Sequence, residues 1–318
     1  MKKKKEKEEK KKKKKIKNKS IIARKVSTRI YKKQKMPEPL ETWTDDIFPA
    51  KKESLCPFDE NGWIFFKYLL KDDVVGWEDY KWCRIEEIED FDNYDVFVEG
   101  ATIDDIKQGD INDCYFLSAI GSLCNYSDFF DKLFHIKEKS EEHAYGIYLY
   151  LNGKWKLVLV DDYFPYSSKD YIFKELCFSC SVQNELWVSL LEKAWAKVNG
   201  CYAKIGCGGF SYEAFDVLTE AYTEQIDIKE FKKEKKEDDL WYKMENSFKK
   251  KYVLTAGTPA ASILERYGLC PGHAYTLINT YKVNTDLGEE RLIKLKNPWG
   301  NTDLQEIGVI IVKNGLQN

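Results

Sequence analysis

The chain has 318 residues, of which 43% are hydrophobic and 33% are charged, and its formal net charge is −2. This length and apolar content are enough for one large or two medium-sized hydrophobic cores, so the chain should fold. No apolar stretch approaches the ~20 residues of a membrane-spanning helix, and the N-terminal lysine run lacks the apolar centre of a signal peptide. We therefore expect a cytoplasmic protein without a transmembrane segment.

Charge is divided unevenly along the chain. Residues 1–36 contain 19 Lys or Arg and 3 Glu, whereas residues 37–318 contain 32 Lys or Arg and 50 Asp or Glu. We expect residues 1–36 to form a disordered Lys-rich tail, because such a segment cannot bury apolar surface. Three interpretations of this tail remain open: it contacts an anionic membrane or nucleic acid, it is a nuclear signal, or it is a solvated tail without a dedicated partner. The acidic remainder argues against a specific nucleic-acid partner and is compatible with binding a hard cation.

Two helices and a β-hairpin are predicted in the first half of the folded region. A polar turn before Cys114 leads into an amphipathic run, which predicts a helix over residues 114–123. Alternating apolar residues predict strands over 144–151 and 155–160, and the Asn152-Gly153 pair between them is a strong hairpin signal. A wide apolar stripe predicts a second long helix over residues 186–198, with Gly200 at the position of a C-terminal cap.

The rest of the chain is predicted to be mostly β. Residues 231–239 are highly charged and predict an exposed connection into a helix over 239–250, and strands are favoured from Tyr252 onward. If the runs 273–283 and 290–297 pair antiparallel around a turn at 284–286, residues whose numbers sum to 570 face each other, so His273 faces Asn297. Cross-strand partners have Cβ atoms ~5 Å apart, which suits an amide oxygen that accepts a hydrogen bond from an imidazole.

Cys114 has the sequence environment of a nucleophile. It opens a predicted helix, where the first-turn amides, the helix dipole and a neighbouring imidazolium would lower the thiol pKa from ~8.5 toward ~4. The order Cys, His, Asn, with His273 and Asn297 far downstream, is that of papain-like thiol proteases. The alternatives are a buried structural thiol and a hydrogen-bonded core histidine.

The other cysteines carry no comparable signal. Nine cysteines, an odd number without framework spacing, indicate a reducing compartment rather than a disulfide scaffold. Cys177 and Cys180 have the spacing of half a zinc site, but no second Cys or His pair of suitable spacing accompanies them. Ordinary packed or surface thiols are the preferred interpretation.

Four motifs follow one another along the chain: Gln-Gly-x-x-x-Asp-Cys at 108–114, a segment from Glu185 to Tyr202, Gly-His-Ala-Tyr at 272–275 and Asn-Pro-Trp-Gly at 297–300. With Phe48-Pro-Ala, Ser54-Leu55 and Val158-Leu-Val-Asp-Asp162, they resemble the catalytic core of the calpain family of cysteine proteases, from about residue 44 to about 303. The resemblance implies an α+β, papain-like fold of two subdomains. Residues 37–221 would form the helical subdomain with Cys114, and residues 222–318 the β-rich one. Residues 61–80 have no counterpart and are interpreted as an insertion.

The resemblance implies a role for each catalytic residue. Cys114 would be the nucleophile, His273 the general acid and base, and Asn297 the residue that orients the imidazole. Gln108 and the backbone N–H of Cys114 would form the oxyanion hole. Taken alone, a glutamine before a helix is an ordinary surface residue.

The resemblance also implies substrate contacts. Gly208 and Gly209 match a glycine pair beside which the substrate backbone lies, and Trp299 would shield the hydrogen bond between His273 and Asn297. Without the resemblance, the glycine pair is typical of any flexible loop and the tryptophan of a core.

Calcium is the cofactor that the resemblance implies. The matching ligands are the backbone carbonyls of Val98 and Gly100 and the side chains of Asp105 and Glu185. Oxygen donors that include two carboxylates suit Ca²⁺. Alternatively, both acids are solvated, or Glu185 is a helix N-terminal charge favoured by the dipole.

The sequence departs from the family at Asn112 and Tyr115, where Gly and Trp are usual, and past the Asn-Pro-Trp-Gly motif. Asp303 matches one ligand of a second calcium loop, but Leu304 replaces the Trp that usually follows. We interpret the chain as an atypical calpain core, truncated in its second subdomain and without a calmodulin-like domain. The expected function is calcium-dependent cleavage of proteins. The alternatives are a catalytically impaired homologue that acts as a binding or regulatory module, and a lysine-tailed protein that binds anionic surfaces.

Overall fold

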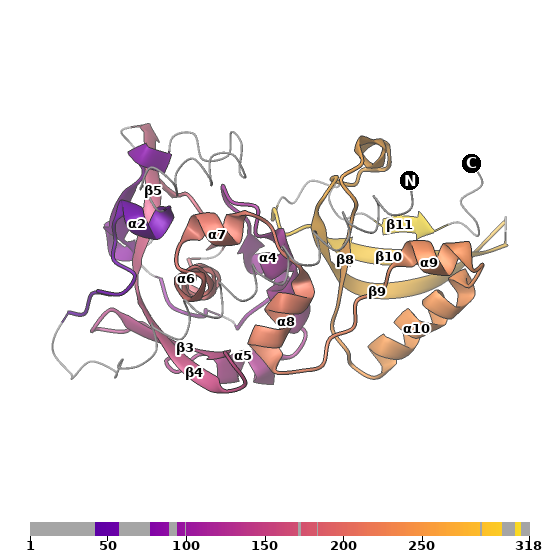
Figure 1. The fold of residues 1–318 in the computed structure, drawn as a ribbon, viewed down its shortest axis with the longest axis horizontal. Helices are drawn as coiled ribbons and strands as arrows, with labels where there is room; N and C mark the ends of the chain where they lie inside the picture. The colour runs from indigo at the N-terminus through magenta and orange to yellow at the C-terminus, as the bar shows by residue number, and fades with distance from the viewer. Residues whose placement is uncertain are drawn as a thin grey trace, which may run out of the picture.

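The computed structural model describes residues 42–56, 77–88, 94–98, 100–170, 173–182, 184–286, 288–300 and 309–312. The Lys-rich tail, Asp303, Leu304 and most of the predicted insertion lie outside these residues. Helices and antiparallel sheets both contribute, as the α+β prediction requires, and they form two parts that lie side by side with helix α4 at the boundary (Figure 1). Within the described residues, no helix is long and apolar enough to cross a membrane.

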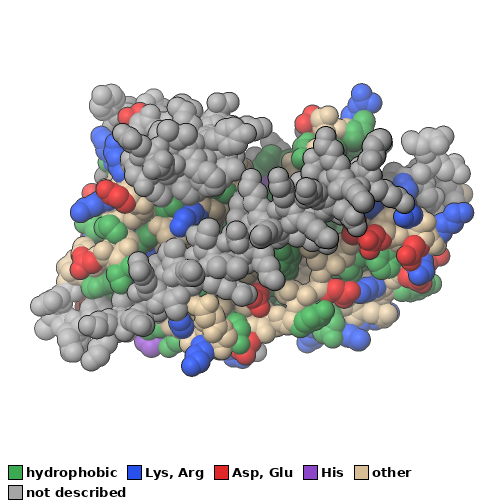
Figure 2. Space-filling model, viewed as in Figure 1, with side chains coloured by type: hydrophobic (Ala, Val, Ile, Leu, Met, Phe, Trp, Pro, Cys, Tyr) green, Lys and Arg blue, Asp and Glu red, His purple; other side chains and the backbone are tan. Residues whose placement is uncertain are grey.

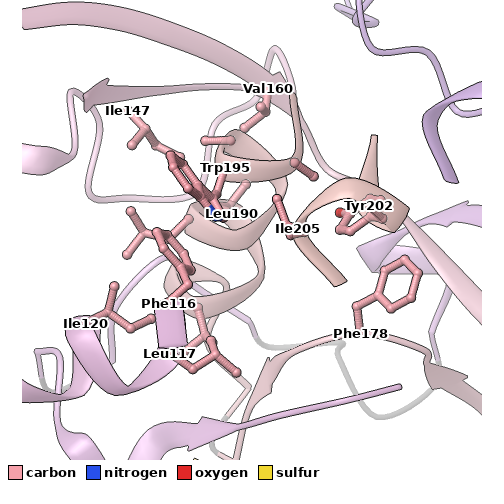
Figure 3. Close-up of a cluster of buried hydrophobic side chains, with 14 of the residues drawn as sticks. Phe116, Leu117, Ile120, Ile147, Val160, Phe178, Leu190, Trp195, Tyr202 and Ile205 are labelled. Carbon is pink, nitrogen blue, oxygen red and sulfur yellow. The ribbon is translucent and has the colours of Figure 1, made fainter. Parts of the chain in front are cut away.

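The first part is built around helix α6, Trp187–Asn199, in which every side chain from Trp187 to Val198 is buried. The Trp195 ring stacks on Phe116 of helix α4, Cys114–Leu123, with 5.3 Å between the ring centroids. Figure 3 shows side chains of α4 and α6 meeting Ile147 and Val160 in one cluster. Because each large apolar side chain contributes roughly 1.5–3 kcal/mol when buried, this cluster fixes α4 firmly. Both predicted helices are confirmed, and Gly200 ends α6 with a left-handed φ of 102°.

The predicted hairpin is also confirmed. Strands β3, Ala144–Tyr150, and β4, Trp155–Asp161, pair antiparallel with Tyr150 opposite Trp155. Asn152 and Gly153 both have positive φ, as a tight hairpin turn requires. The other elements of the first part are short: α2 (Lys52–Leu55), η2 (Trp77–Asp79), β1 (Lys81–Arg84), η3 (Ile85–Glu87), η5 (Ile103–Asp105), β2 (Ile106–Lys107), α5 (Ser127–Leu133), β5 (Tyr163–Asp170), β6 (Phe173–Leu176), β7 (Cys180–Ser181), α7 (Tyr202–Gly206) and α8 (Ser211–Thr219). Strands β1, β5 and β6 form one sheet, and β2 pairs with β7.

Two buried lysines of α6 hold the start of the described chain. The Nζ of Lys197 donates to Asp45 Oδ2 and to the Leu159 carbonyl oxygen, both at 2.6 Å. Lys193 forms an ion pair with Asp161, whose other oxygen accepts from the Asp45 N–H at 2.8 Å. Both lysine side chains are fully buried, so these bonds replace the water that the charges lose.

The second part is a four-stranded antiparallel sheet in the order β11-β10-β9-β8, as the β-rich prediction from Tyr252 onward requires. A small core of Tyr275, Leu277 and Leu295 lies between the sheet and helix α10, to which Met244 and Phe248 belong. The elements are α9 (Ile228–Lys233), α10 (Glu237–Lys249), β8 (Leu254–Gly257), η6 (Ser262–Tyr267), β9 (Ala274–Thr285), β10 (Gly288–Lys296) and β11 (Val309–Val312).

The predicted exposed connection at 231–239 is wrong in conformation. Most of that segment belongs to α9 and to the first turn of α10, which begins at Glu237, two residues earlier than predicted. The Asp227 side chain caps α9 by accepting the Lys229 N–H at 2.9 Å, and three acids lie in the first turn of α10, where the helix dipole favours negative charge. Figure 2 shows acidic and basic side chains intermixed over this end of the molecule. The charges that indicated a loop therefore stabilise two exposed helices.

The predicted register of the β9–β10 hairpin is wrong. Strand β9 ends at Thr285 and β10 begins opposite it at Gly288, which makes the turn shorter than expected. A register shift follows between Lys294 and Leu295, after which Thr276 faces Lys296. Asn297 is therefore not the cross-strand partner of His273. Both residues lie just outside their strands, so any contact between them depends on the path of the backbone beyond the strand ends.

Candidate active site

Cys114 is the first residue of α4, and its sulfur lies against the second part of the molecule. The half-buried sulfur accepts hydrogen bonds from the backbone N–H of Ala274, the first residue of β9, and from that of Tyr115. Since Ala274 follows His273 directly, the thiol and the imidazole-bearing residue meet where the two parts join.

The thiol is not activated by its position in the way that the sequence indicated. The pKa of Cys114 is raised to about 11, chiefly by burial and to a lesser extent by the charge of Asp113, and the backbone amide hydrogen bonds offset this rise only in part. Burial also lowers the pKa of His273, although the hydrogen bond to Asn297 opposes this. Both groups are therefore neutral in this arrangement, because desolvation outweighs the helix N-terminus.

His273 and Asn297 are joined by a buried hydrogen bond of 2.8 Å between Nε2 and Oδ1. The same Oδ1 accepts the backbone N–H of Trp299 at 3.2 Å, which identifies it as the acceptor. The ring must then donate from Nε2, and Nδ1 is left as the nitrogen that takes a proton. The Trp299 ring lies 5.0 Å from the imidazole and is 41% exposed, so it covers the site from outside and is not part of the core.

The backbone of His273 is held by a residue that the sequence did not identify. Thr258, just after β8, accepts the His273 N–H on its Oγ1 at 2.9 Å and donates its own N–H to the His273 carbonyl at 2.8 Å. A threonine after a strand carries no sequence signal for this role, because its partner lies fifteen residues away and is reached only in the folded chain.

A second unpredicted contact joins α4 to β9. The Oγ of Ser118 donates to the Ala274 carbonyl, and the Oγ1 of Thr276 donates to the Ser118 carbonyl, each at 2.9 Å and buried. Gly121 allows this approach, since a Cβ there would lie 2.6 Å from Thr276 Oγ1. The helix with the thiol and the strand that follows the histidine are thus positioned by direct hydrogen bonds.

Gln108 lies beside the segment that follows Asn297. Its backbone N–H donates to the Pro298 carbonyl at 2.8 Å, and its side-chain Nε2 donates to the Ile111 carbonyl at 2.6 Å. An amide nitrogen has two N–H bonds, so one remains for an oxyanion. Its Oε1 is buried without a partner among the described residues, and the side chain is therefore held through Nε2 alone.

The two glycines of the predicted substrate loop differ in their surroundings. Gly208 has a φ of 74° and open space where a side chain would lie. Gly209 packs on the ring of Tyr115, which a Cβ would approach to 2.7 Å. Tyr115 in turn accepts the Trp195 indole N–H at 3.0 Å. Gly208 leaves its backbone accessible, whereas Gly209 is needed for packing.

Three of the four predicted calcium ligands, Val98, Asp105 and Glu185, interact with one another, and Gly100 lies two residues after Val98 in the chain. Glu185 accepts the Val98 N–H on Oε1 at 2.7 Å, and its pKa is raised by burial and also by the charge of Asp105. Asp105 is buried and accepts the Thr102 N–H at 2.7 Å, and Gly100 has a φ of 89°. Two buried carboxylates that repel each other, beside the exposed Val98 backbone, fit a hard cation. Among the described residues, no group of three or more His, Cys, Asp or Glu side chains forms a metal cluster, so the backbone carbonyls would be needed.

Comparison with known proteins gives a consistent result. Residues 43–306 match the family described as calpain family cysteine protease. The calpain-1 catalytic subunit of Bos taurus is 34% identical over 232 residues, which are 70% of this chain and 31% of that protein. The calpain-2 catalytic subunit of Bos taurus is 31% identical over 268 residues, covering 81% of this chain and 35% of that protein. The calpain-type cysteine protease ADL1 of Oryza sativa subsp. japonica is 31% identical over 267 residues, covering 81% of this chain and 12% of that protein. The chain thus spans about a third or less of the length of these relatives.

Proposed function

Because the chain belongs to the calpain family of cysteine proteases, we propose that it is a calcium-dependent endopeptidase that cleaves proteins through Cys114, His273 and Asn297. The observation that carries this proposal is the contact between the two parts. The sulfur of Cys114 accepts the N–H of Ala274, while the neighbouring imidazole is oriented by Asn297. The division between the proposed subdomains falls near residue 221, in the connection from α8 to α9.

In the proposed reaction, His273 takes the thiol proton of Cys114 through Nδ1, since Nε2 is engaged by Asn297. The sulfur attacks the peptide carbonyl carbon, and the oxyanion is stabilised by the Cys114 N–H and the Gln108 amide, each donor being worth roughly 3 kcal/mol. The intermediate expels the amine, which His273 protonates, and a thioester remains. Water that gives a proton to His273 then hydrolyses the thioester and restores the thiol.

The substrate lies along Gly208, where the exposed backbone offers hydrogen bonds without a side chain in the way. Gly209 shapes the same loop through Tyr115. Trp299 bounds the cleft at the imidazole and limits access of water to the hydrogen bond of Asn297.

We assign calcium to the carboxylates of Asp105 and Glu185 and the carbonyls of Val98 and Gly100. A bound Ca²⁺ would neutralise the two facing carboxylates. Glu185 immediately precedes Leu186 and α6, and Asp105 lies in η5, so these residues would link the start of the core helix to the segment that leads to Gln108.

A catalytically impaired homologue, acting as a binding or regulatory module, is the second candidate. Two observations favour it: the thiol pKa of Cys114 is raised, and one N–H of Gln108 is already bonded to Ile111. A thiol of raised pKa is a weaker nucleophile at neutral pH, and the bond to Ile111 takes up one of the two N–H groups that Gln108 could offer an oxyanion.

The test is hydrolysis of a fluorescent casein, in excess calcium and in excess chelator. We expect calcium-dependent activity in the wild type, none in Cys114→Ala, and near wild-type activity in Cys124→Ala, the matched control just past the other end of α4. Equal hydrolysis by wild type and Cys114→Ala would refute the peptidase. Failure of an epoxide thiol-protease inhibitor to label Cys114 at any calcium concentration would support the impaired homologue.

We also propose a cytoplasmic location, because the nine cysteines are odd in number and lack the spacing of a disulfide framework, as is typical of a reducing compartment. Residues 1–36 would contact anionic membranes through their positive charge. Vesicles containing phosphatidylserine should then bind the full chain but not a variant that lacks residues 1–36, and binding should weaken with added salt.

A further inference from the structure

Two carboxyl groups face each other directly behind the candidate nucleophile. Asp113 precedes Cys114, and Glu192 lies on α6; their side chains are within hydrogen-bonding contact and 0% and 1% exposed. Both carboxyl oxygens of Asp113 are buried and have no N–H or O–H donor among the described residues. Both oxygens of Glu192 accept the backbone N–H of Ser179, at 3.1 Å each.

This arrangement requires a proton between the two groups. Two ionised carboxylates at contact distance in a buried site repel each other, and carboxylates have no hydrogen to donate. Burial, and then the charge of Glu192, raise the pKa of Asp113, and burial raises that of Glu192. Glu192 already accepts a donor from Ser179, so it is the group better suited to the negative charge, and Asp113 is the group that carries the proton.

The ionisable groups around the pair do not neutralise it. Cys114 and Tyr115 of α4 and Tyr202 of α7 face the carboxyls, and their pKa values are raised by burial and by the charge of one or both acids. The cations next along α6, Lys193 and Lys197, bond Asp161 and Asp45 instead. The proton is therefore the counter-charge available to Asp113 within the described residues.

Asp113 also determines where α4 begins. Its carbonyl accepts the N–H of Phe116 at 2.8 Å and of Leu117 at 3.2 Å, and the peptide that follows it carries the N–H of Cys114. Holding the Asp113 side chain against α6 thus fixes the orientation of that N–H. The same side chain, if it ionised, would place a negative charge beside the sulfur and oppose a thiolate.

We propose that Asp113 and Glu192 share one proton and act as a positioning pair, which fixes the first peptide of α4 and keeps negative charge away from the sulfur. This inference rests on the proposed role of Cys114 as nucleophile. It assigns neither acid to the chemical step, since neither touches the substrate carbonyl. It makes the reactivity of the thiol depend on a buried carboxyl pair.

The test is the rate at which iodoacetamide alkylates Cys114 between pH 6 and pH 10, located by peptide mass mapping in the full-length protein. Asp113→Asn keeps a donor to Glu192 and, like the protonated Asp113, carries no charge, so the thiol should titrate and alkylate as it does in the wild type. Glu192→Gln offers a donor to Asp113 and lets it ionise, so the thiol should titrate at higher pH and alkylate more slowly. Asp216→Asn, an exposed acid on α8, should match the wild type.

A wild-type profile for Asp113→Asn, together with slower alkylation in Glu192→Gln, supports the pair. Alkylation at pH 7 that is about threefold or more faster in Asp113→Asn than in the wild type, or no slowing in Glu192→Gln, would overturn it; if Asp113→Asn does not fold, the direction found for Glu192→Gln decides. Positioning has its own readout: Asp113→Ala is as uncharged as Asp113→Asn but cannot bond Glu192, so kcat/KM should fall at least tenfold below that of Asp113→Asn. Equal values would show that the hydrogen bond to Glu192 does not position the first peptide of α4, and would overturn positioning. Alkylation needs no peptide cleavage, so its outcome stands even if the casein assay fails.

Discussion

Gly121→Ala tests whether the contact between α4 and β9 sets the geometry of the site. The added methyl carbon would lie 2.6 Å from Thr276 Oγ1, about 0.8 Å short of the 3.4 Å at which ordinary contact begins. Thr276 is buried and bonded to Ser118, so the helix and the strand must move apart. Overpacking costs roughly 1–3 kcal/mol, while alanine gains ~0.8–1.0 kcal/mol over glycine in a helix.

The stability loss should therefore be small and the activity loss large. We expect the free energy of unfolding to fall by no more than ~2 kcal/mol in urea titrations. We expect kcat/KM on the fluorescent casein to fall roughly 10- to 100-fold, because a displacement near 1 Å between reacting groups costs about that much. Gly257→Ala is the matched control, since a Cβ at that exposed position of β8 meets nothing within 4 Å.

The double variant Gly121→Ala, Thr276→Ala provides the decisive comparison. Removing Oγ1 takes away the clashing atom, so the double variant should be more active than Gly121→Ala alone even though it loses the hydrogen bond to Ser118. Activity of Gly121→Ala within twofold of the Gly257→Ala control, or a double variant no better than the single one, would refute the reasoning.

Three further predictions concern other parts of the site and core. Asn297→Ala should lower kcat/KM by about 10- to 100-fold, since a hydrogen bond to a charged group is worth ~1.5–3 kcal/mol. The pKa of His273, followed by NMR, should fall further because that bond raises it, and an unchanged titration would contradict this role. Lys197→Met leaves the buried Asp45 without its counter-ion, so the free energy of unfolding should fall by ~3–5 kcal/mol, and a loss below ~1 kcal/mol would argue against the pair. Calcium at 100 times its Kd should stabilise the wild type by ~2.7 kcal/mol, seen as a rise in Tm, and Glu185→Gln should lose most of that rise; an undiminished rise would exclude this site.

The parts of the fold that the sequence predicted are those set by local chemistry. Helix α4 follows from its apolar spacing, the β3–β4 hairpin from Asn152-Gly153, and the end of α6 from Gly200. The β9–β10 register was not predictable from spacing, because the register shift after Lys294 has no marker in the sequence. The charges of residues 231–239 were misread because the same residues suit a loop and an exposed helix.

The candidate site, like the fold, was predicted only in part from the sequence. The sequence predicted a hydrogen bond between His273 and Asn297, near Cys114, because the two residues were expected to be cross-strand partners. The bond does form, but it lies beyond the strand ends and does not join cross-strand partners. Thr258 and the carboxyl pair were missed because each depends on a contact between distant segments. The raised pKa of Cys114 was missed because burial is a property of the whole fold, whereas a helix N-terminus is visible in the sequence.

The burial that positions Cys114, the proposed nucleophile, also determines which charged forms of Cys114 and His273 can exist in the site. A thiolate at Cys114 or an imidazolium at His273, formed alone, is opposed by desolvation, as the raised and lowered pKa values indicate. Formed together, the two ions stabilise each other, and at a given separation this attraction is stronger in a buried site than in water. The attraction falls as the charges separate, so the ion pair depends on the spacing between α4, fixed in the first core, and β9, fixed in the second. The hydrogen bonds of Ser118 with Ala274 and Thr276 set that spacing. They therefore affect the transfer of the proton from Cys114 to His273 as well as the relative position of the two side chains.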